Sequence, residues 1–396
     1  MARKNQTAGD QLYRSHSRNA AKRSEPPRED RRRRQIRSWI ILVSVVVLVL
    51  LGIRFFGGRK PQELTASRLP CYANQSVTPF ADGVLYYDGA SIHCLSGTGV
   101  IRWSFPAGTG ASFYAGPKHV AVWSGAQMFL VDEQGRATYN ESMDGNVQFV
   151  RVGERYAAVV IGADTEPRLI VKDLNGTQVD MEQEAFSGLM ILDVGFYGDR
   201  GEYLWTLSLD VFGTAANTLL NTFQVGKMNT GVVSLGSALT YKVIYENAKL
   251  RVFTTQQMYT YDYKGVQDAS STMLVYGWKL IDSEVPERGA ARMLLAPTSQ
   301  TSSAQQITEL RVLEGSDDKR YTLPDSCVGA CMWQGNIYAF SGNNYLYRAD
   351  VASQRFFTTG IPLPEHANVT AFFGVTTDGH ALLAAGDSVY SLSLPK

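Results

Sequence analysis

The chain has 396 residues, and its formal net charge of +1 conceals two segments of opposite sign. Residues 1–37 contain twelve basic and four acidic residues, a net charge of about +8, whereas residues 61–396 contain 23 basic and 33 acidic ones, a net charge of about −10. An acidic C-terminal part disfavours nucleic-acid binding there, and the asymmetry predicts two compartments or two kinds of partner. Residues 61–396 suffice for a large core in one all-β domain.

The N-terminal tail, residues 1–37, is rich in Arg, Ser, Asn, Gln and Glu and has almost no large apolar side chains. This composition is typical of disordered segments. Next to the apolar run that follows, the tail carries a cluster of basic residues: Arg31, Arg32, Arg33, Arg34 and Arg37. We expect this cluster to bind anionic lipids of the inner leaflet, as part of a membrane anchor.

Residues 38–56 predict a transmembrane helix. The run has 19 residues, mostly Val and Leu, with Trp39 at its near interface, and a span needs about 20. Basic residues before the run outnumber those at or after its end, so the positive-inside rule predicts a cytoplasmic N-terminus and a large domain outside the cytoplasmic membrane. A cleaved signal peptide is the alternative, but the basic region is long for one and no A-x-A-like cleavage site follows.

Residues 57–70 predict a linker, because they combine glycine, proline and polar residues. From Cys71 onward, short runs of Val, Ile, Leu, Tyr and Phe are separated by Gly, Asn and Asp. This pattern predicts short antiparallel strands rather than long helices. We therefore expect residues 71–396 to form an all-β domain that is tethered close to the membrane.

A turn of the form Asp-x-x-Gly recurs at Asp132, Asp173 and Asp262. The first two turns are 41 residues apart and the last two are 89 residues apart, which corresponds to one and then two repeats of about 41 to 44 residues. The aspartate caps the turn and the glycine supplies a positive φ, so we expect a structural role for both. This period, with about four strands a unit, is typical of a β-propeller. It favours one propeller of eight blades, with seven blades as the alternative and a pair of β-sandwiches as the competing architecture. The last copy lacks its fourth strand, which residues 62–72 are expected to supply.

The segment TGVIRW contains Thr98, Gly99 and Trp103, and Gly135 and Tyr139 repeat the spacing with another aromatic residue. On these residues the chain resembles the PQQ-like and WD40-like β-propellers with a tryptophan-docking motif. It looks most like the membrane-anchored, single-pass propellers of unassigned function in Gram-positive bacteria. The resemblance implies that Trp103 docks against the neighbouring blade. It does not extend to the quinone cofactor, because the adjacent cysteine pair of the quinoprotein dehydrogenases is missing, so no cofactor is expected.

Four cysteines follow the predicted span: Cys71, Cys94, Cys327 and Cys331. An even number outside the cytoplasm permits two disulfides, and three pairings are open. Cys71 with Cys94 is the first candidate, because Cys71 leads into the first repeat copy and Cys94 lies on one of its strands; buried thiols are the alternative. Cys327 and Cys331 on one extended strand would lie about 13 Å apart, too far for a bond. No second ligand pair is present, so we expect no zinc site.

No catalytic, cofactor or metal site is expected, because the chain has no G-x-S-x-G, H-E-x-x-H or P-loop motif. We expect a non-catalytic binding or scaffold module outside the membrane, whose partner is an envelope protein or a cell-surface polymer. Two lengthened turns, near 210–221 and 297–306, are the candidate contact loops. The alternative is a polysaccharide hydrolase or lyase, which would need two carboxylates about 5–10 Å apart at the channel mouth.

Overall fold

The computed structural model divides the chain into two units, Met1–Gln62 and Glu63–Lys396. The described residues are 39, 41–47, 64–198, 200–246, 248–286, 289–298 and 306–395. Of the predicted span 38–56, Trp39 and residues 41–47 are described, and they are helical and exposed. Within the described part of the chain, no helix is long and apolar enough to cross a membrane. The rest of the span, the tail and the cluster from Arg31 to Arg37 lie outside the described residues.

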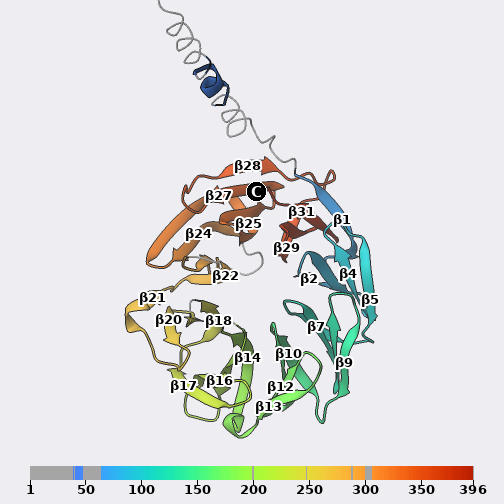
Figure 1. The fold of residues 1–396 in the computed structure, drawn as a ribbon, viewed down its shortest axis with the longest axis vertical. Helices are drawn as coiled ribbons and strands as arrows, with labels where there is room; N and C mark the ends of the chain where they lie inside the picture. The colour runs from blue at the N-terminus through green and yellow to red at the C-terminus, as the bar shows by residue number, and fades with distance from the viewer. Residues whose placement is uncertain are drawn as a thin grey trace, which may run out of the picture. The chain divides into compact units, whose positions relative to one another are not determined.

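The second unit is a ring of antiparallel sheets (Figure 1). The first sheet contains β2 (Ser76–Phe80), β3 (Gly83–Tyr87), β4 (Ser91–Ser96) and β5 (Ile101–Pro106). The second contains β6 (Ser112–Ala115), β7 (His119–Ser124), β8 (Gln127–Asp132) and β9 (Ala137–Ser142). The third contains β10 (Val147–Val152), β11 (Tyr156–Ala163), β12 (Glu166–Asp173) and β13 (Gln178–Glu182), followed by the 3₁₀ helix η1 (Glu184–Phe186).

The next two sheets repeat this order. The fourth contains β14 (Leu189–Tyr197), β15 (Tyr203–Asp210), β16 (Asn217–Gln224) and β17 (Met228–Gly236). The fifth contains β18 (Thr240–Glu246), β19 (Lys249–Thr254), β20 (Gln257–Asp262) and β21 (Met273–Leu274), with the 3₁₀ helix η2 (Ala269–Ser271) before its last strand. In each sheet the strands are hydrogen-bonded in chain order. Sheets of four strands set around a ring are the architecture of a β-propeller, not of a sandwich pair.

The sixth sheet has seven strands. It contains β22 (Trp278–Glu284), β23 (Arg292–Pro297), β24 (Ile307–Glu314), β25 (Asp317–Trp333), β26 (Asn336–Ser341), β27 (Tyr345–Asp350) and β28 (Phe357–Gly360). The long strand β25 is shared, because its first half pairs with β24 and its second half pairs with β26.

The ring closes in a sheet that joins the two ends of the described unit. It contains β29 (Val369–Val375), β30 (His380–Ala385), β31 (Ser388–Ser393) and, as its outer strand, β1 (Ala66–Tyr72). Ala66 pairs with Leu392 and Tyr72 with Ser388, which is the closure that the shortened last repeat predicts. Residues 66–70 were expected in the linker but belong to β1, because this strand covers the edge that β31 would otherwise expose.

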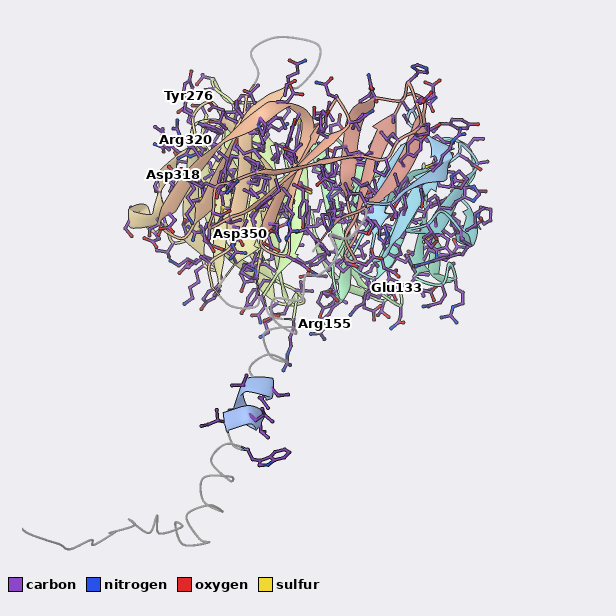
Figure 2. The ribbon with its side chains drawn as sticks, turned by 90° about the horizontal axis from the view of Figure 1, so that it is seen from above. Glu133, Arg155, Tyr276, Asp318, Arg320 and Asp350 are labelled. Atoms are coloured by element: carbon purple, nitrogen blue, oxygen red, sulfur yellow. The ribbon has the colours of Figure 1, made fainter. Side chains whose placement is uncertain are left out.

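The two ends of the ring carry different connections. The turn face carries the hairpins between the first and second strands and the Asp-x-x-Gly turns, including residues 116–118, 132–136, 153–155, 173–177 and 198–202. The loop face carries the hairpins between the second and third strands and the connections between sheets, including residues 163–166, 182–189, 210–217, 236–240 and 274–278. Figure 2 shows Arg155 and Glu133 at one edge of the ring and Tyr276 at the other.

Candidate functional site

Neighbouring sheets dock on the turn face through a repeated contact. Trp103 of β5 lies on the Asp132 turn of the second sheet, where its indole Nε1 donates a hydrogen bond to the carbonyl of Glu133 at 2.8 Å. A Cβ added at Gly135 would lie 2.6 Å from Cγ of Trp103, so a side chain at this position would displace the indole. Tyr139 lies over Gly176 of the third sheet in the same way.

Thr98 and Gly99 form the matching turn of the first sheet. The hydroxyl oxygens of Thr98 and Ser96 are 2.9 Å apart, and Gly99 has a φ of +89°. A Cβ at Gly99 would lie 3.3 Å from Cδ2 of Leu69 in β1. The closing strand thus uses the same kind of contact, with a leucine where the next two contacts have an aromatic ring.

The repeated aspartates are structural, as the sequence predicts. Oδ1 of Asp173 accepts hydrogen bonds from the backbone N–H of Asn175 and Thr177 at 2.9 and 2.8 Å. Asp262 accepts from two backbone N–H groups of its own turn with the same spacing. Each carboxylate therefore replaces the backbone acceptors that a tight turn cannot provide.

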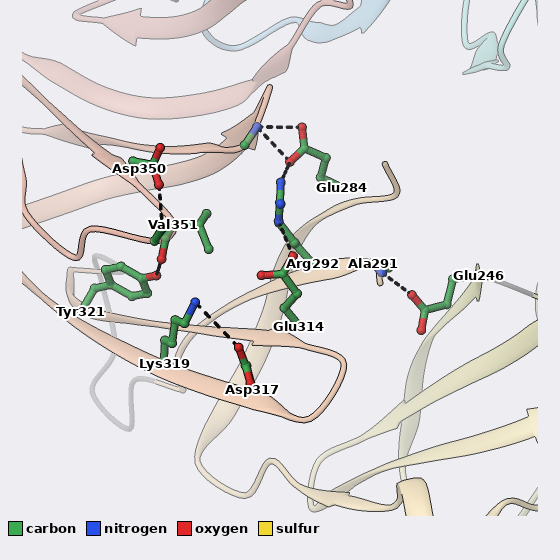
Figure 3. A network of polar contacts seen from close by, with 12 residues as sticks. Glu246, Glu284, Ala291, Arg292, Glu314, Asp317, Lys319, Tyr321, Asp350 and Val351 are labelled. Carbon is green, nitrogen blue, oxygen red and sulfur yellow. Dashed lines mark hydrogen bonds and ion pairs between the residues drawn. The ribbon is translucent and has the colours of Figure 1, made fainter. Parts of the chain in front are cut away.

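A polar network, buried at Glu246 and half-buried elsewhere, joins the later sheets on the turn face (Figure 3). Glu246, with only 2% of its surface exposed, pairs with Arg251 at 2.6 Å and accepts the backbone N–H of Ala291 at 2.7 Å. Ala291 belongs to the connection before β23, so this carboxylate links two sheets. Arg292 pairs with Glu314 at 2.9 Å and with Glu284 at 3.3 Å. These charges are compensated inside the fold and leave little to offer a ligand.

The predicted disulfide between Cys71 and Cys94 is not formed, and all four cysteines are free and buried. The first sheet separates the two side chains. Cys71 packs between the first and last sheets, near Leu382, and Cys94 packs between the first and second sheets, near Val122. Burial raises the pKa of Cys71 to about 12 and that of Cys94 to about 11. Both thiols therefore stay protonated and behave as small apolar side chains.

The inner strands share a bulge that the sequence analysis missed. The residues between which the strand pairing shifts are Val147/Phe149 in β10, Ile191/Asp193 in β14, Thr240/Lys242 in β18 and Leu280/Asp282 in β22. A bulge turns the next side chain out of the regular alternation. At two of these bulges the second residue is an aspartate, Asp193 or Asp282. In the sequence, the only local signal for them is a run of two apolar residues before the aspartate, "ILD" and "LID".

A cavity of about 710 Å³ opens on the turn face between β6, β10, β14 and β18. Arg151 lies in its wall and donates from Nε to Oδ1 of Asp193 at 2.8 Å. Its guanidinium also lies over the ring of Tyr114, 4.8 Å from the centroid. The other carboxylate in the described lining, Glu154, pairs with Lys118 at 3.1 Å. Both carboxylates are neutralised by cations, whereas acid–base catalysis on a glycan needs one protonated group and one free carboxylate.

A second cavity of about 420 Å³ lies where β22, β25 and β29 approach each other. Asp282 lines it, and burial raises the pKa of this carboxyl group. Its oxygens accept the backbone N–H groups of Met332 at 2.7 Å and of Ser283 at 2.8 Å. Asp282 thus holds β25 against β22, a role that satisfies the carboxylate within the fold.

One Ser–His–Asp arrangement occurs on the first sheet. Nδ1 of His93 is 2.7 Å from Oγ of Ser104, and Nε2 is 2.7 Å from Oδ2 of Asp88. The histidine ring stacks on Tyr86 at 4.7 Å, and none of the three polar residues lines a cavity described here. A catalytic triad acts beside an oxyanion hole and a substrate pocket. Sequence reasoning missed this group because strand register, not a motif, brings it together.

The loop face exposes apolar side chains on adjacent connections. We call the following residues the apolar rim: Val211, Phe212, Leu239, Leu274 and Tyr276. Phe212 and Tyr276 have 69% and 70% of their surface exposed. Backbone hydrogen bonds tie the connections together, from Thr255 N–H to the carbonyl of Leu239 and from Val275 N–H to the carbonyl of Gln256. Large apolar side chains that are exposed on one end of a fold are candidates for an interaction surface.

No protein-family model matches the chain, and no curated protein matches its sequence. Solved structures match its fold. Sqt1 of Saccharomyces cerevisiae has a TM-score of 0.57 at 10% identity, over 84% of this chain and all of its own. BamB from Moraxella catarrhalis has a TM-score of 0.51 at 9% identity, over 83% of this chain and 98% of its own. The computationally designed Ika8 protein gives 0.52 at 11% identity, over 83% of this chain and 98% of its own. These likenesses show the fold alone, that of a β-propeller.

Proposed function

We propose that the chain is a non-catalytic scaffold module that binds a protein partner through its loop face. The observation that carries this proposal is the apolar rim. Its side chains are exposed on one end of the ring, whereas the two carboxylates in the described lining of the cavity at the opposite end have cationic partners. A surface that exposes large apolar side chains costs solubility unless a partner covers it.

The ring is proposed to have eight blades. The seven-stranded sheet divides at β25, whose two halves pair with different neighbours. Two blades of four strands that share β25 give this pattern. The other six sheets supply one blade each.

The module is proposed to be anchored in the cytoplasmic membrane by residues 38–56, with the N-terminus in the cytoplasm and the ring outside. The apolar run and the preceding basic cluster support this topology. The chain enters the ring at the turn face, where Ser393 N–H donates to the carbonyl of Thr65, and β1 then runs toward the loop face. The partner that the loop face binds is proposed to be an envelope protein.

The proposal is tested by co-purification of the full-length protein from its native membrane after cross-linking. The wild type is compared with Phe212→Ser/Tyr276→Ser and with Phe357→Ser, a matched control on the outer strand β28 with 61% of its surface exposed. We expect one protein partner that is lost with the rim variant and kept with the control. A partner retained by the rim variant, or capture of surface polymer alone, contradicts the proposal.

A further inference from the structure

An acidic groove lies on the loop face of the third sheet. It has a volume of about 660 Å³ and is formed by the start of β12, the end of β13 and η1. Its lining contains Glu166, Pro167, Met181, Glu182, Gln183, Glu184 and Ser187. Three of these residues are acidic and none is basic, while Met181, with 47% of its surface exposed, adds an apolar contact.

The charge of this groove is not compensated within the described part of the chain. The basic residues of the same sheet have other partners: Arg168 pairs with Asp144, and Lys172 with Glu141 at 2.7 Å. The pKa of Glu182 is raised, first by burial and then by the neighbouring carboxylates of Asp180 and Glu184. The groove thus differs from the cavity on the turn face, where the described carboxylates have cationic partners.

The groove is continuous with the apolar rim. Gly188, which follows η1, donates its backbone N–H to the carbonyl of Thr165 at 3.0 Å. A Cβ at Gly188 would lie 3.9 Å from Cδ2 of Phe212. The loop between β11 and β12, the connection around η1 and the loop that carries Phe212 are therefore in contact.

Resting on the proposed function, we propose that the groove and Phe212 bind a cationic polypeptide segment of the partner. Arginine or lysine side chains of this segment pair with Glu182 and Glu184, and an aliphatic or aromatic side chain packs on Met181 and Phe212. Complementary charge gives such an interface its specificity and speeds association, and arginine combines charge with apolar packing. An anionic polymer is repelled by the same surface.

The test uses the full-length protein in an uncharged detergent and a labelled synthetic peptide with two Arg-Leu pairs separated by glycine and serine. Fluorescence anisotropy gives its dissociation constant. We expect salt-sensitive binding that weakens about tenfold in E182Q/E184Q and about fivefold in Phe212→Ser. The matched controls are Glu133→Gln on the turn face and Phe357→Ser on β28, both exposed, and we expect changes below about twofold. A peptide with Glu-Leu pairs is expected not to bind.

Equal affinity for the wild type and for E182Q/E184Q overturns this inference, as does the absence of binding. The outcome is separable from that of the proposed function. If the native partner still requires the apolar rim but is unaffected by E182Q/E184Q, the rim binds a partner of other chemistry and only the cationic segment is excluded. If the partner is retained by both variants, both proposals fall.

Discussion

The two ends of the ring differ in how their residues are used. On the turn face, one short pattern is repeated: an aspartate caps a turn, and its glycine approaches an aromatic or aliphatic side chain of the preceding sheet, as at Asp173, Gly176 and Tyr139. On the loop face, residues such as Phe212 and Glu184 point outward and do not repeat from sheet to sheet. We propose that the loop face carries recognition and expect the turn face to carry stability, so substitutions at the two ends are expected to separate the two properties.

The largest expected loss of stability follows from breaking the buried ion pair between Glu246 and Arg251 on the turn face. Glu246→Ala leaves Arg251 buried without its partner and removes the acceptor of the Ala291 N–H, so we expect a loss of about 3–5 kcal/mol in the free energy of unfolding. The loop-face control Glu184→Ala is expected to cost less than about 0.5 kcal/mol. Urea unfolding of the full chain, followed by tryptophan fluorescence, measures both. Similar losses of stability for the two variants would contradict the assignment of stability to the turn face.

Two glycines test the docking contact. Gly135 has a φ of +79° and faces Trp103, whereas Gly125 on the loop face has a φ of +58° and open space where a Cβ would be added. We expect Gly135→Ala to lower the free energy of unfolding by about 2–4 kcal/mol, because strain and overpacking add. Gly125→Ala is expected to cost about 1 kcal/mol, from its backbone alone. Equal costs in the same urea titration would mean that the close approach to Trp103 carries no energy.

Two substitutions of Trp103 measure separately what its ring packing and its hydrogen bond contribute to stability. Trp103→Phe keeps an aromatic ring on the next sheet but loses the bond to the carbonyl of Glu133, so we expect a cost of about 1 kcal/mol. Trp103→Ala also removes the packing and is expected to cost about 2–3 kcal/mol, less than a fully buried tryptophan. Thermal unfolding of the full chain ranks the variants. A phenylalanine variant as unstable as the alanine variant contradicts this division.

The smallest expected effect on stability is electrostatic and comes from the carboxylate of Asp88 on the loop face. Hydrogen bonds from His93 and from the backbone of Ser91 and Ala90 lower the pKa of Asp88 to about 2. Because the folded pKa is below the unfolded value of about 3.9, the ionised group stabilises the fold above about pH 4, and this contribution is lost as the pH falls toward about 2.

Unfolding midpoints of the wild type and Asp88→Asn measure this contribution. The wild type is expected to exceed the variant by a small margin at about pH 5, since the carboxylate is exposed and screened, and the margin is expected to close near about pH 2. If the difference in unfolding midpoint between the wild type and Asp88→Asn grows as the pH falls, the direction of the pKa shift of Asp88 is contradicted.

Features set by local sequence were predictable. The Asp-x-x-Gly repeat identified the turns, the shortened last copy identified the closing strand, and alternating short strands identified an all-β ring. Features that depend on which sheets become neighbours were not. Cys71 and Cys94 are close in sequence, but a sheet lies between them. The pair of Arg151 and Asp193 forms only because β10 and β14 are inner strands of adjacent sheets.

The candidate site was predictable only in part. The lengthened turn near 210–221 was singled out by its length, and its loop carries Phe212. The second turn, near 297–306, lies largely outside the described residues. The acidic groove had no sequence signal, because Glu166 begins β12 whereas Glu184 lies in η1, and only the fold brings them to one groove, through the pairing of β12 with β13 and the hydrogen bond from Gly188 to Thr165.

The assignment of recognition to the loop face is tested most directly by site-specific photo-cross-linking in the native membrane. A photoreactive residue is placed singly in the full-length protein, at Phe212 or Tyr276 on the loop face and at Glu133 or Arg155 on the turn face. Figure 2 shows Tyr276 at one edge of the ring and Glu133 and Arg155 at the other. The account predicts one cross-linked protein product from the two loop-face positions and none from the turn face. A product from Glu133 or Arg155 alone would place recognition on the turn face and contradict the account.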